Sequence, residues 1–289
     1  MSIVPQIIIN SIIAGSLYAL VAMGFSLIYS VTKFFNLAHG VLAAVGGYGV
    51  FFFGRMLGLP VMVAVALGIL IATLVGWLLE RCVFSPLRSR KSSALVLLVA
   101  SLGAFTAIQA LIALLFGSQF LTLAPILEGG SPFTVAGATI TDVQIVLVGT
   151  ALAAFVCVWL ILKKTSFGKV VRATADDEEV AKIVGINTHK VIGKTFVIGS
   201  MLAGMAGILS GFDTGIEPIM GLPLLLKGVI AAIIGGMGSV PGALLGAYLL
   251  GFSENVGVWF IPGEWKDAIS FSILILFLLL RPFGILGRK

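Results

Sequence analysis

The sequence predicts an all-α membrane protein, a polytopic bundle of transmembrane helices with about eight membrane segments (a range of seven to nine spans). Hydrophobic residues make up 59% of the chain and charged residues 10%, against about 25% charged residues in soluble domains. Long apolar runs recur along the whole length, and each is a candidate membrane helix. We expect a single domain over residues 1–289. Its amino terminus, MSIVPQIIIN, lacks the basic segment and the cleavage pattern of a signal peptide, so we expect it to begin a retained first helix.

The expected membrane segments follow the apolar runs in order. They are 3–31, 34–53, 57–79, 94–117, 143–162, 191–211, 222–251 and 268–280. The second is rich in glycine, and the third stops at Glu80 and Arg81. The seventh is interrupted by GGMGSVPG at 235–242. Because lipid cannot satisfy the backbone groups that such a break frees, the break is either a turn at one membrane surface between two spans or the tip of a re-entrant hairpin.

Basic residues are distributed unevenly between the loops. Fifteen of the 18 follow the first, third, fifth or last segment, whereas 118–142 and 213–221 contain none. Loops rich in Lys and Arg remain in the cytoplasm. We therefore expect the amino terminus outside and the carboxyl terminus in the cytoplasm. The net charge of +6 expresses this asymmetry and does not indicate a nucleic-acid surface.

The loop 163–190 is the longest of the basic loops, and it contains four consecutive acidic residues at 176–179. Thr174 followed by Asp177 predicts a capping-box-like helix start, and the helix dipole favours acidic residues in that first turn. Gly185 ends the helix, with Asn187 just beyond. Two interpretations stay open, a helix lying on the membrane surface and a helix docked in a groove of a cytoplasmic partner, which avoids repulsion by anionic lipid. Its apolar face would consist of Ala173, Val180, Ala181 and Val184.

The segment Glu179-Val180-Ala181, followed by Gly185, resembles the E-A-A-x-x-x-G signature of the coupling loop in bacterial ABC importer permeases. Ala181 keeps the second alanine position, but Val180 replaces the first, and the Ile and Leu-Pro that often follow are absent at the usual spacing. The resemblance implies that the helix 174–184 sits in a cleft of an ATPase subunit. The expected coupling residues are Thr174, Asp177, Glu178, Glu179, Ala181, Gly185 and Asn187.

Three separated stretches together resemble the LivH-type permeases of branched-chain amino acid importers. They are SLYALVAMGFSLIYSVTKFFNLAHG (16–40), RATADDEEVAKIVGIN (172–187) and AAIIGGMGSVPGALLGA (231–247). The resemblance implies a permease subunit in the bacterial inner membrane, in contact with membrane lipid and paired with a second related permease. Two cytoplasmic ATPase subunits and a periplasmic substrate-binding protein would complete the importer. The implied substrates are leucine, isoleucine, valine or related amino acids, with urea or short amides as the alternative.

The same resemblance implies that this chain is not an enzyme. It contains no G-x-x-x-x-G-K-[ST] sequence, so ATP and Mg would be bound by the partner subunits and we expect no cofactor here. No nucleophile or acid–base pair indicates a catalytic residue. Two cysteines and two histidines are too few to predict a metal site.

Polar side chains within the predicted spans are candidates for a translocation path, although hydrogen bonding between helices is the simpler interpretation of each. Asn36 and His39 cluster with Lys33 at one membrane face, where we favour a capped helix start over a proton-relay histidine. Lys227 either extends along its helix toward the surface or pairs with a substrate carboxylate, Asp213 or Glu217. The path candidates are Asn10, Tyr18, Asn36, His39, Gln109 and Lys227.

Two other classes of function remain open. A self-sufficient channel or secondary transporter would normally need an intramembrane carboxylate that couples an ion. We expect Glu80, Asp142, Asp213 and Glu254 at the ends of spans instead. A non-transporting scaffold would need only the docking helix, and the many glycine-broken spans argue mildly against it.

Overall fold

The computed structural model describes residues 3–123, 126, 133–135 and 137–287. It is 81% helical, which confirms the all-α class. The α-helices are α1 (Ile3–Thr32), α2 (Ala38–Val50), α3 (Val61–Leu79), α4 (Ser85–Ser89), α5 (Ala94–Phe116), α6 (Asp142–Lys164), α7 (Ser166–Asp176), α8 (Glu178–Ile183), α9 (Thr188–Asp213), α10 (Gly221–Gly235), α11 (Val240–Phe260) and α12 (Lys266–Leu280). Two π-helical turns, η1 (Phe51–Met56) and η2 (Glu80–Phe84), a 3-10 turn, η4 (Gly263–Trp265), and the strands β1 (Phe133–Val135) and β2 (Ala138–Ile140) complete the described elements.

Six helices in the described part of the chain are long and apolar enough to cross a membrane. They are Val4–Thr32, Val61–Ser89, Ala94–Phe116, Asp142–Lys164, Thr188–Asp213 and Val240–Phe260. The apolar helices α2, α10 and α12 are shorter, so the count of eight segments stays a prediction. The third segment does not stop at Glu80, as the sequence suggested. The helix continues through η2 into α4, and Glu80 is buried there against Arg88.

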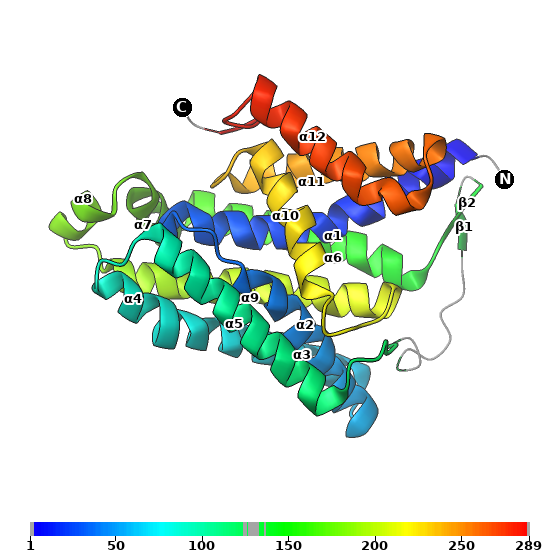
Figure 1. Cartoon of the computed structure of the whole chain (residues 1–289), viewed down its shortest axis with the longest axis horizontal. Helices are drawn as coiled ribbons and strands as arrows, with labels where there is room; N and C mark the ends of the chain where they lie inside the picture. Colours follow the sequence, from blue (N-terminus) through cyan, green and yellow to red (C-terminus); the bar gives the residue numbers. More distant parts are fainter. Residues whose placement is uncertain (1–2, 124–125, 127–132, 136, 288–289) are drawn as a thin grey trace.

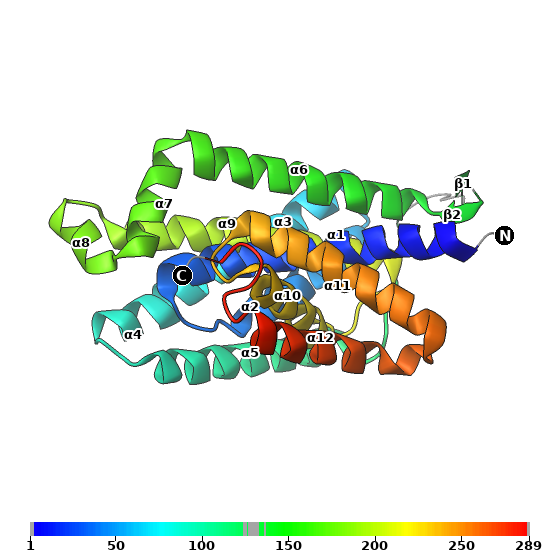
Figure 2. The ribbon, with the colours of Figure 1, turned by 90° about the horizontal axis from the view of Figure 1, so that it is seen from above.

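Helix α1 runs through the middle of the bundle and packs against α6, α9, α10 and α11. Figure 2 shows α6 along one flank and α5 along the other, with α1 between them. The most apolar window of α1 is 83% buried and that of α9 is 72% buried, whereas the windows of α3, α5 and α6 are at most 22% buried. Apolar side chains exposed in this way belong against hydrocarbon. The core therefore surrounds α1 and α9, and α3, α5 and α6 form the lipid-facing periphery.

Helix α2 begins inside the bundle and not at its edge. Its residue His39 lies against Gly24 of α1, eight residues before the end of that helix, which is about 12 Å along the axis. The backbone N–H of Leu37, just before α2, donates a hydrogen bond to Ser101 Oγ of α5 at 3.0 Å. Irregular backbone at this depth is tolerated because the surrounding helices cover it.

Glycines bring the backbones of the central helices into direct contact. A Cβ atom added at Gly46 of α2 would lie 2.6 Å from the carbonyl oxygen of Gly204 in α9, and one added at Gly49 would lie 3.0 Å from the Cα of Gly68 in α3. No side chain fits into these gaps. Small residues allow such close approach of membrane helices, so the glycine-rich second segment is a packing surface.

The break at 235–242 is a short turn between α10 and α11. Gly238 N–H donates to Ser26 Oγ of α1 at 3.0 Å, and the backbone N–H groups of Ile285 and Leu286 donate to the carbonyls of Ile234 and Gly235. Neighbouring protein thus satisfies the backbone groups of this turn. The re-entrant interpretation stays a prediction.

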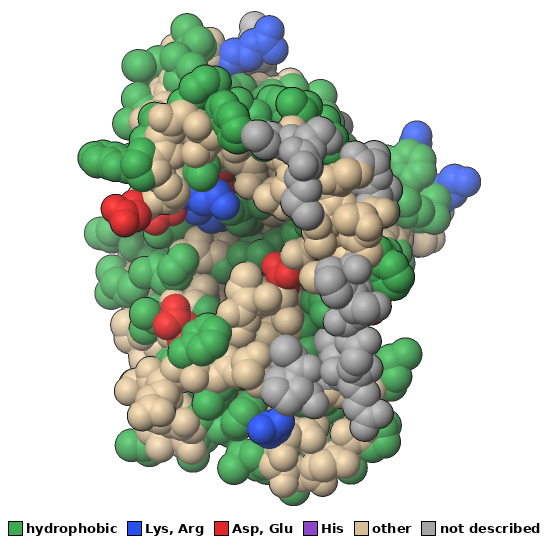
Figure 3. All heavy atoms as spheres, turned by 90° about the vertical axis from the view of Figure 1, so that its right-hand side faces the viewer, with side chains coloured by type: hydrophobic (Ala, Val, Ile, Leu, Met, Phe, Trp, Pro, Cys, Tyr) green, Lys and Arg blue, Asp and Glu red, His purple; other side chains and the backbone are tan. Residues whose placement is uncertain are grey.

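The two ends of the bundle differ in charge. Helices α4, α7 and α8 project at the left of Figure 1, together with most of the basic residues, and we call this the basic end. At the opposite end β1 pairs antiparallel with β2, with Phe133 opposite Ile140, and Gln6 of α1 exchanges two hydrogen bonds with the backbone of Thr139. Figure 3 faces that end and shows few Lys or Arg side chains.

Candidate functional site

The acidic stretch at the basic end forms two helices, joined at Asp177. Asp177 adopts an extended backbone conformation, and its Oδ1 accepts hydrogen bonds from the N–H groups of Glu179 at 2.8 Å and Val180 at 3.0 Å. Asp177 is therefore the N-cap of α8, and not the third residue of a helix that starts at Thr174. Thr174 lies in the last turns of α7, where it is buried and donates to the carbonyl of Val170. The predicted single helix was wrong because Thr165 already caps the preceding helix, with Oγ1 accepting from Gly168 N–H.

Helix α8 ends where the sequence predicts. Gly185 has a φ of +85°, a conformation that carries little penalty only for glycine. Its N–H donates to the carbonyl of Lys182, and the next N–H, of Ile186, donates to the carbonyl of Ala181. This pair of bonds is the Schellman motif, which satisfies the last carbonyls of a helix. Asn187 then caps α9 by accepting from Lys190 N–H at 3.1 Å.

Glu178 ties α8 to the start of α9. Its Oε1 accepts a hydrogen bond from Thr188 Oγ1 at 3.1 Å and lies 2.8 Å from Lys182 Nζ. Burial raises the pKa of Glu178. The hydrogen bonds from Lys182 and Thr188 and the nearby positive charges, Arg88 among them, together outweigh this effect, so the pKa lies below the usual 4.5. The carboxylate is thus held in its charged form and fixes the angle at which α8 leaves the bundle.

The outer surface of α8 includes three exposed apolar side chains. Ala181 is buried, while Val180, Ile183 and Val184 are 54%, 83% and 68% exposed. The single apolar face expected from the sequence is therefore divided, with Ala181 toward the protein and three branched side chains outward. Glu179 is exposed beside them. A projecting helix tip of this kind offers anchors to a groove on another protein.

A second cluster lies inside the bundle, between α1, α10, α11 and α12. Lys227 Nζ lies 2.7 Å from Glu254 Oε1 and 2.8 Å from Asp267 Oδ1, and it donates to Ser270 Oγ at 2.6 Å. Tyr18 Oη donates to Glu254 Oε2 at 2.8 Å, and Ser270 also donates to Glu254. The Glu254 carboxylate is fully buried, yet every interaction it makes favours its negative charge.

This cluster corrects two expectations. Lys227 neither extends freely to the surface nor pairs with Asp213 or Glu217; Asp213 instead accepts a hydrogen bond from Gln144 at 3.0 Å. Glu254 does not lie at a span end, because α11 continues to Phe260. The sequence carried a usable signal, since Lys227 and Glu254 are opposite charges in neighbouring apolar segments. Glu254, Asp267 and Ser270 were missed as polar partners.

Asn36 and His39 form a separate buried pair of polar side chains. The N-cap of α2 is Leu37, with no side-chain hydrogen bond, so the capped helix start was wrong. Both ring nitrogens of His39 and the amide oxygen of Asn36 lack a hydrogen-bond partner among the described residues. The His39 ring is fully buried, and the backbone of Gly24 lies close against it.

The remaining path candidates lie apart from both clusters. Asn10 is exposed on α1 and accepts a hydrogen bond from Gln6 at 2.9 Å, and Gln109 is half-buried on α5. A hollow of about 760 Å³ between α3, α6 and α9 is mostly apolar, and none of the six candidates lines it. The structure therefore joins only Tyr18 with Lys227, and Asn36 with His39. Within the described ranges, no three His, Cys, Asp or Glu side chains are grouped to hold a metal ion.

Comparison with known proteins identifies the family of the chain. The chain is 36% identical to LivH, the high-affinity branched-chain amino acid transport system permease protein of Salmonella typhimurium, over 98% of this chain and 95% of that protein. Its identity is 35% to LivH of Escherichia coli K12 and 34% to BraD of Pseudomonas aeruginosa, with the same coverage. The solved structure of PsaBC from Streptococcus pneumoniae shares the fold, with a TM-score of 0.52 and 17% identity over 94% of this chain and 91% of that one. A family model described as the permease component of the branched-chain amino acid transport system matches residues 7–278. The chain belongs to this permease family.

Proposed function

We propose that the chain is the membrane permease subunit of an ATP-driven ABC importer that moves branched-chain or related amino acids across the bacterial inner membrane. Family membership over residues 7–278 supports the class of transporter. The names of relatives at 34–36% identity support the substrate class, with urea or short amides as the alternative. The complex would include a second related permease, two ATPase subunits and a periplasmic binding protein.

The observation that carries the proposal is the exposed tip of α8. Its position at the basic end supports a cytoplasmic location, because loops rich in Lys and Arg stay in the cytoplasm. The N-cap Asp177, the C-terminal Gly185 and the bond from Thr188 to Glu178 hold α8 in one orientation. An ATPase that grips Val180, Ile183 and Val184 would therefore move the amino-terminal end of α9, and through it the core.

The substrate path would lie between two permease subunits. None of the polar path candidates lines the hollow within this single chain. A buried carboxylate such as Glu254 is what an ion-coupled carrier would need, and it gives specific support to the alternative of a secondary transporter. Its bonds to Lys227, Tyr18 and Ser270 satisfy it internally, which favours a structural role.

The test is copurification of the ATPase with the tagged permease, together with ATP-dependent uptake. Ile183→Asp places a charge in the apolar tip, and we expect a loss of at least about 30-fold in ATPase affinity, because buried apolar anchors contribute about 2 kcal/mol or more. Ile219→Asp is the matched control, since Ile219 is also more than half exposed but lies near the opposite end. Uptake that persists without ATP, or an ATPase that binds Ile183→Asp unchanged, would contradict the proposal.

A further inference from the structure

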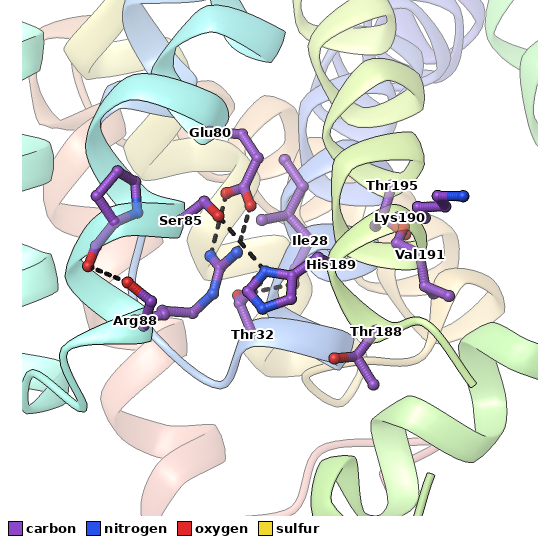
Figure 4. A network of polar contacts seen from close by, with 12 residues as sticks. Ile28, Thr32, Glu80, Ser85, Arg88, Thr188, His189, Lys190, Val191 and Thr195 are labelled. Carbon is purple, nitrogen blue, oxygen red and sulfur yellow. Dashed lines mark hydrogen bonds and ion pairs between the residues drawn. The ribbon is translucent and has the colours of Figure 1, made fainter. Parts of the chain in front are cut away.

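A basic pocket opens between α3 and α9 at the basic end. It encloses about 340 Å³. Arg81, Lys190 and Lys194 line it and are all exposed. The one acidic residue in its wall, Glu80, is already paired with Arg88, as Figure 4 shows. The remaining side chains give the pocket a net positive charge, and the positive end of the α9 dipole adds to it.

The wall of this pocket has features that its packing does not require. Arg81 belongs to the π-helical turn η2 and lies 5.4 Å from the centre of the Trp77 ring. Such turns inside helices often accompany functional sites. Gly193 of α9 also lines the pocket, and a Cβ atom added there would meet nothing within 4 Å. Glycine weakens a helix, so its effect at this position is to leave room in the pocket.

Exposed apolar side chains continue from the pocket along the same two helices. Leu74 and Leu70 lie one and two turns from Trp77 on α3, and Met201 lies one turn from the pocket residue Val197 on α9. Residues at these spacings share a helix face. Leu74, Leu70 and Met201 are 50%, 59% and 40% exposed. Tryptophan at the boundary between polar and apolar surface is typical of a membrane interface.

We propose that this pocket binds the phosphate head group of an anionic phospholipid, with the acyl chains lying against the exposed side chains of Leu70, Leu74 and Met201. Basic pockets between membrane helices recognise such head groups. A free phosphate ion would satisfy the three cations equally, but it would make no contact with the exposed apolar side chains beyond the pocket. An acidic surface of a soluble partner would not reach these side chains at membrane depth. The proposal rests on the proposed function in one respect only: the basic end lies at the cytoplasmic leaflet of the membrane.

Native mass spectrometry of the purified complex, titrated with phosphatidylglycerol or phosphatidylcholine, tests this binding directly. We expect phosphatidylglycerol to be retained and phosphatidylcholine not. Replacing the three cations by Arg81→Gln, Lys190→Gln and Lys194→Gln should weaken retention about 100-fold, since each basic residue near anionic lipid contributes about fivefold. The control carries Lys163→Gln, Lys164→Gln and Lys169→Gln, which remove the same charge from exposed positions at the same end. It should retain the lipid.

A second pair of variants keeps the charge constant. Gly193→Leu fills the pocket and should abolish retention, whereas Gly193→Ala should leave it unchanged. This pair decides the question if the triple variant fails to fold, because the added side chain enters open space.

Three results would overturn the proposal. Equal loss in the Lys163, Lys164 and Lys169 control would mean unspecific attraction to charged lipid. Displacement of the lipid by an equimolar amount of inorganic phosphate would mean an anion site without lipid recognition. Loss of the ATPase from the triple variant with lipid retention unchanged would mean a protein contact. Lipid retention is measured without transport, so failure of the proposed importer activity would not change the result.

Discussion

The buried pair between Lys227 and Glu254 allows a sharp test of how the bundle is held together. Lys227→Met preserves the length of the side chain and removes its charge. Glu254 is fully buried and would lose the cation that it pairs with. Removing one partner from a buried ion pair costs about 3–5 kcal/mol, because the other charge is left uncompensated. The remaining hydrogen bonds from Tyr18 and Ser270 cannot replace the lysine.

The same lysine provides an internal comparison. Asp267, its second carboxylate partner, is 75% exposed and lies 2.8 Å from Nζ. Exposed ion pairs contribute about 0–1 kcal/mol, so Asp267→Asn should have little effect. The double variant Lys227→Met with Glu254→Gln removes both buried charges and should recover most of the stability lost by Lys227→Met alone.

Thermal unfolding of the purified protein in mild detergent measures these differences. At roughly 2–4 °C for each kcal/mol in chains of 150–250 residues, Lys227→Met should lower the Tm by about 10 °C. Lys164→Met, on an exposed lysine, is the control for charge removal and should leave the Tm unchanged. If Lys227→Met has the same Tm as the wild type, or if the Tm of the double variant is no higher than that of Lys227→Met, the reasoning about an uncompensated buried charge is refuted.

Three further predictions concern α8 and its ends. Asp177→Ala removes the N-cap of α8 and should destabilise the helix by about 1 kcal/mol, which would be measured as faster hydrogen exchange of the amides of 179–183. Thr174→Ala removes no cap of α8 and should leave that exchange unchanged. Equal exchange in the two variants would contradict the assignment of the cap. Gly185→Ala forces a side chain into a left-handed conformation at a cost of about 1 kcal/mol or more, and should weaken ATPase copurification, whereas Gly193→Ala in an ordinary helical position should not. Glu178 has a pKa in the folded protein below its usual 4.5. Its contribution to the stability of α8 is therefore complete above pH 4.5 and is lost as the pH falls through the lowered pKa. Protection of the α8 amides from hydrogen exchange should be constant from about pH 6 to 8 and fall in acid, and Glu178→Gln should remove this pH dependence.

Local features of the fold were predictable from the sequence, and features set by tertiary packing were not. The helical character of the apolar runs and the end of α8 at Gly185 depend on neighbouring residues alone, and both agree with the structure, although the third run continues past Glu80. The start of α8 was misplaced because Thr174 and Asp177 are both good caps, and only the folding of 166–176 into α7 decides between them.

The interior polar residues show the same limit. Lys227 and Glu254 are recognisable in the sequence as opposite charges in neighbouring apolar segments, but only the packing of α10 against α11 brings them together. The coupling residues formed a nearly continuous stretch and could be proposed together. The path candidates came from separate segments, and the structure brings together only Tyr18 with Lys227 and Asn36 with His39.

The contacts of Gly46 with Gly204 and of Gly49 with Gly68 have a mechanical meaning. Where two backbones touch without intervening side chains, no rotamer has to change when one helix slides along the other. Helix α2 therefore meets α3 and α9 at glycine-to-glycine contacts, which reduce the side-chain interlocking that fixes ordinary helix pairs in register. A methyl group added at Gly46 or Gly49 would press against the backbone of the facing helix and oppose movement of α2 along it.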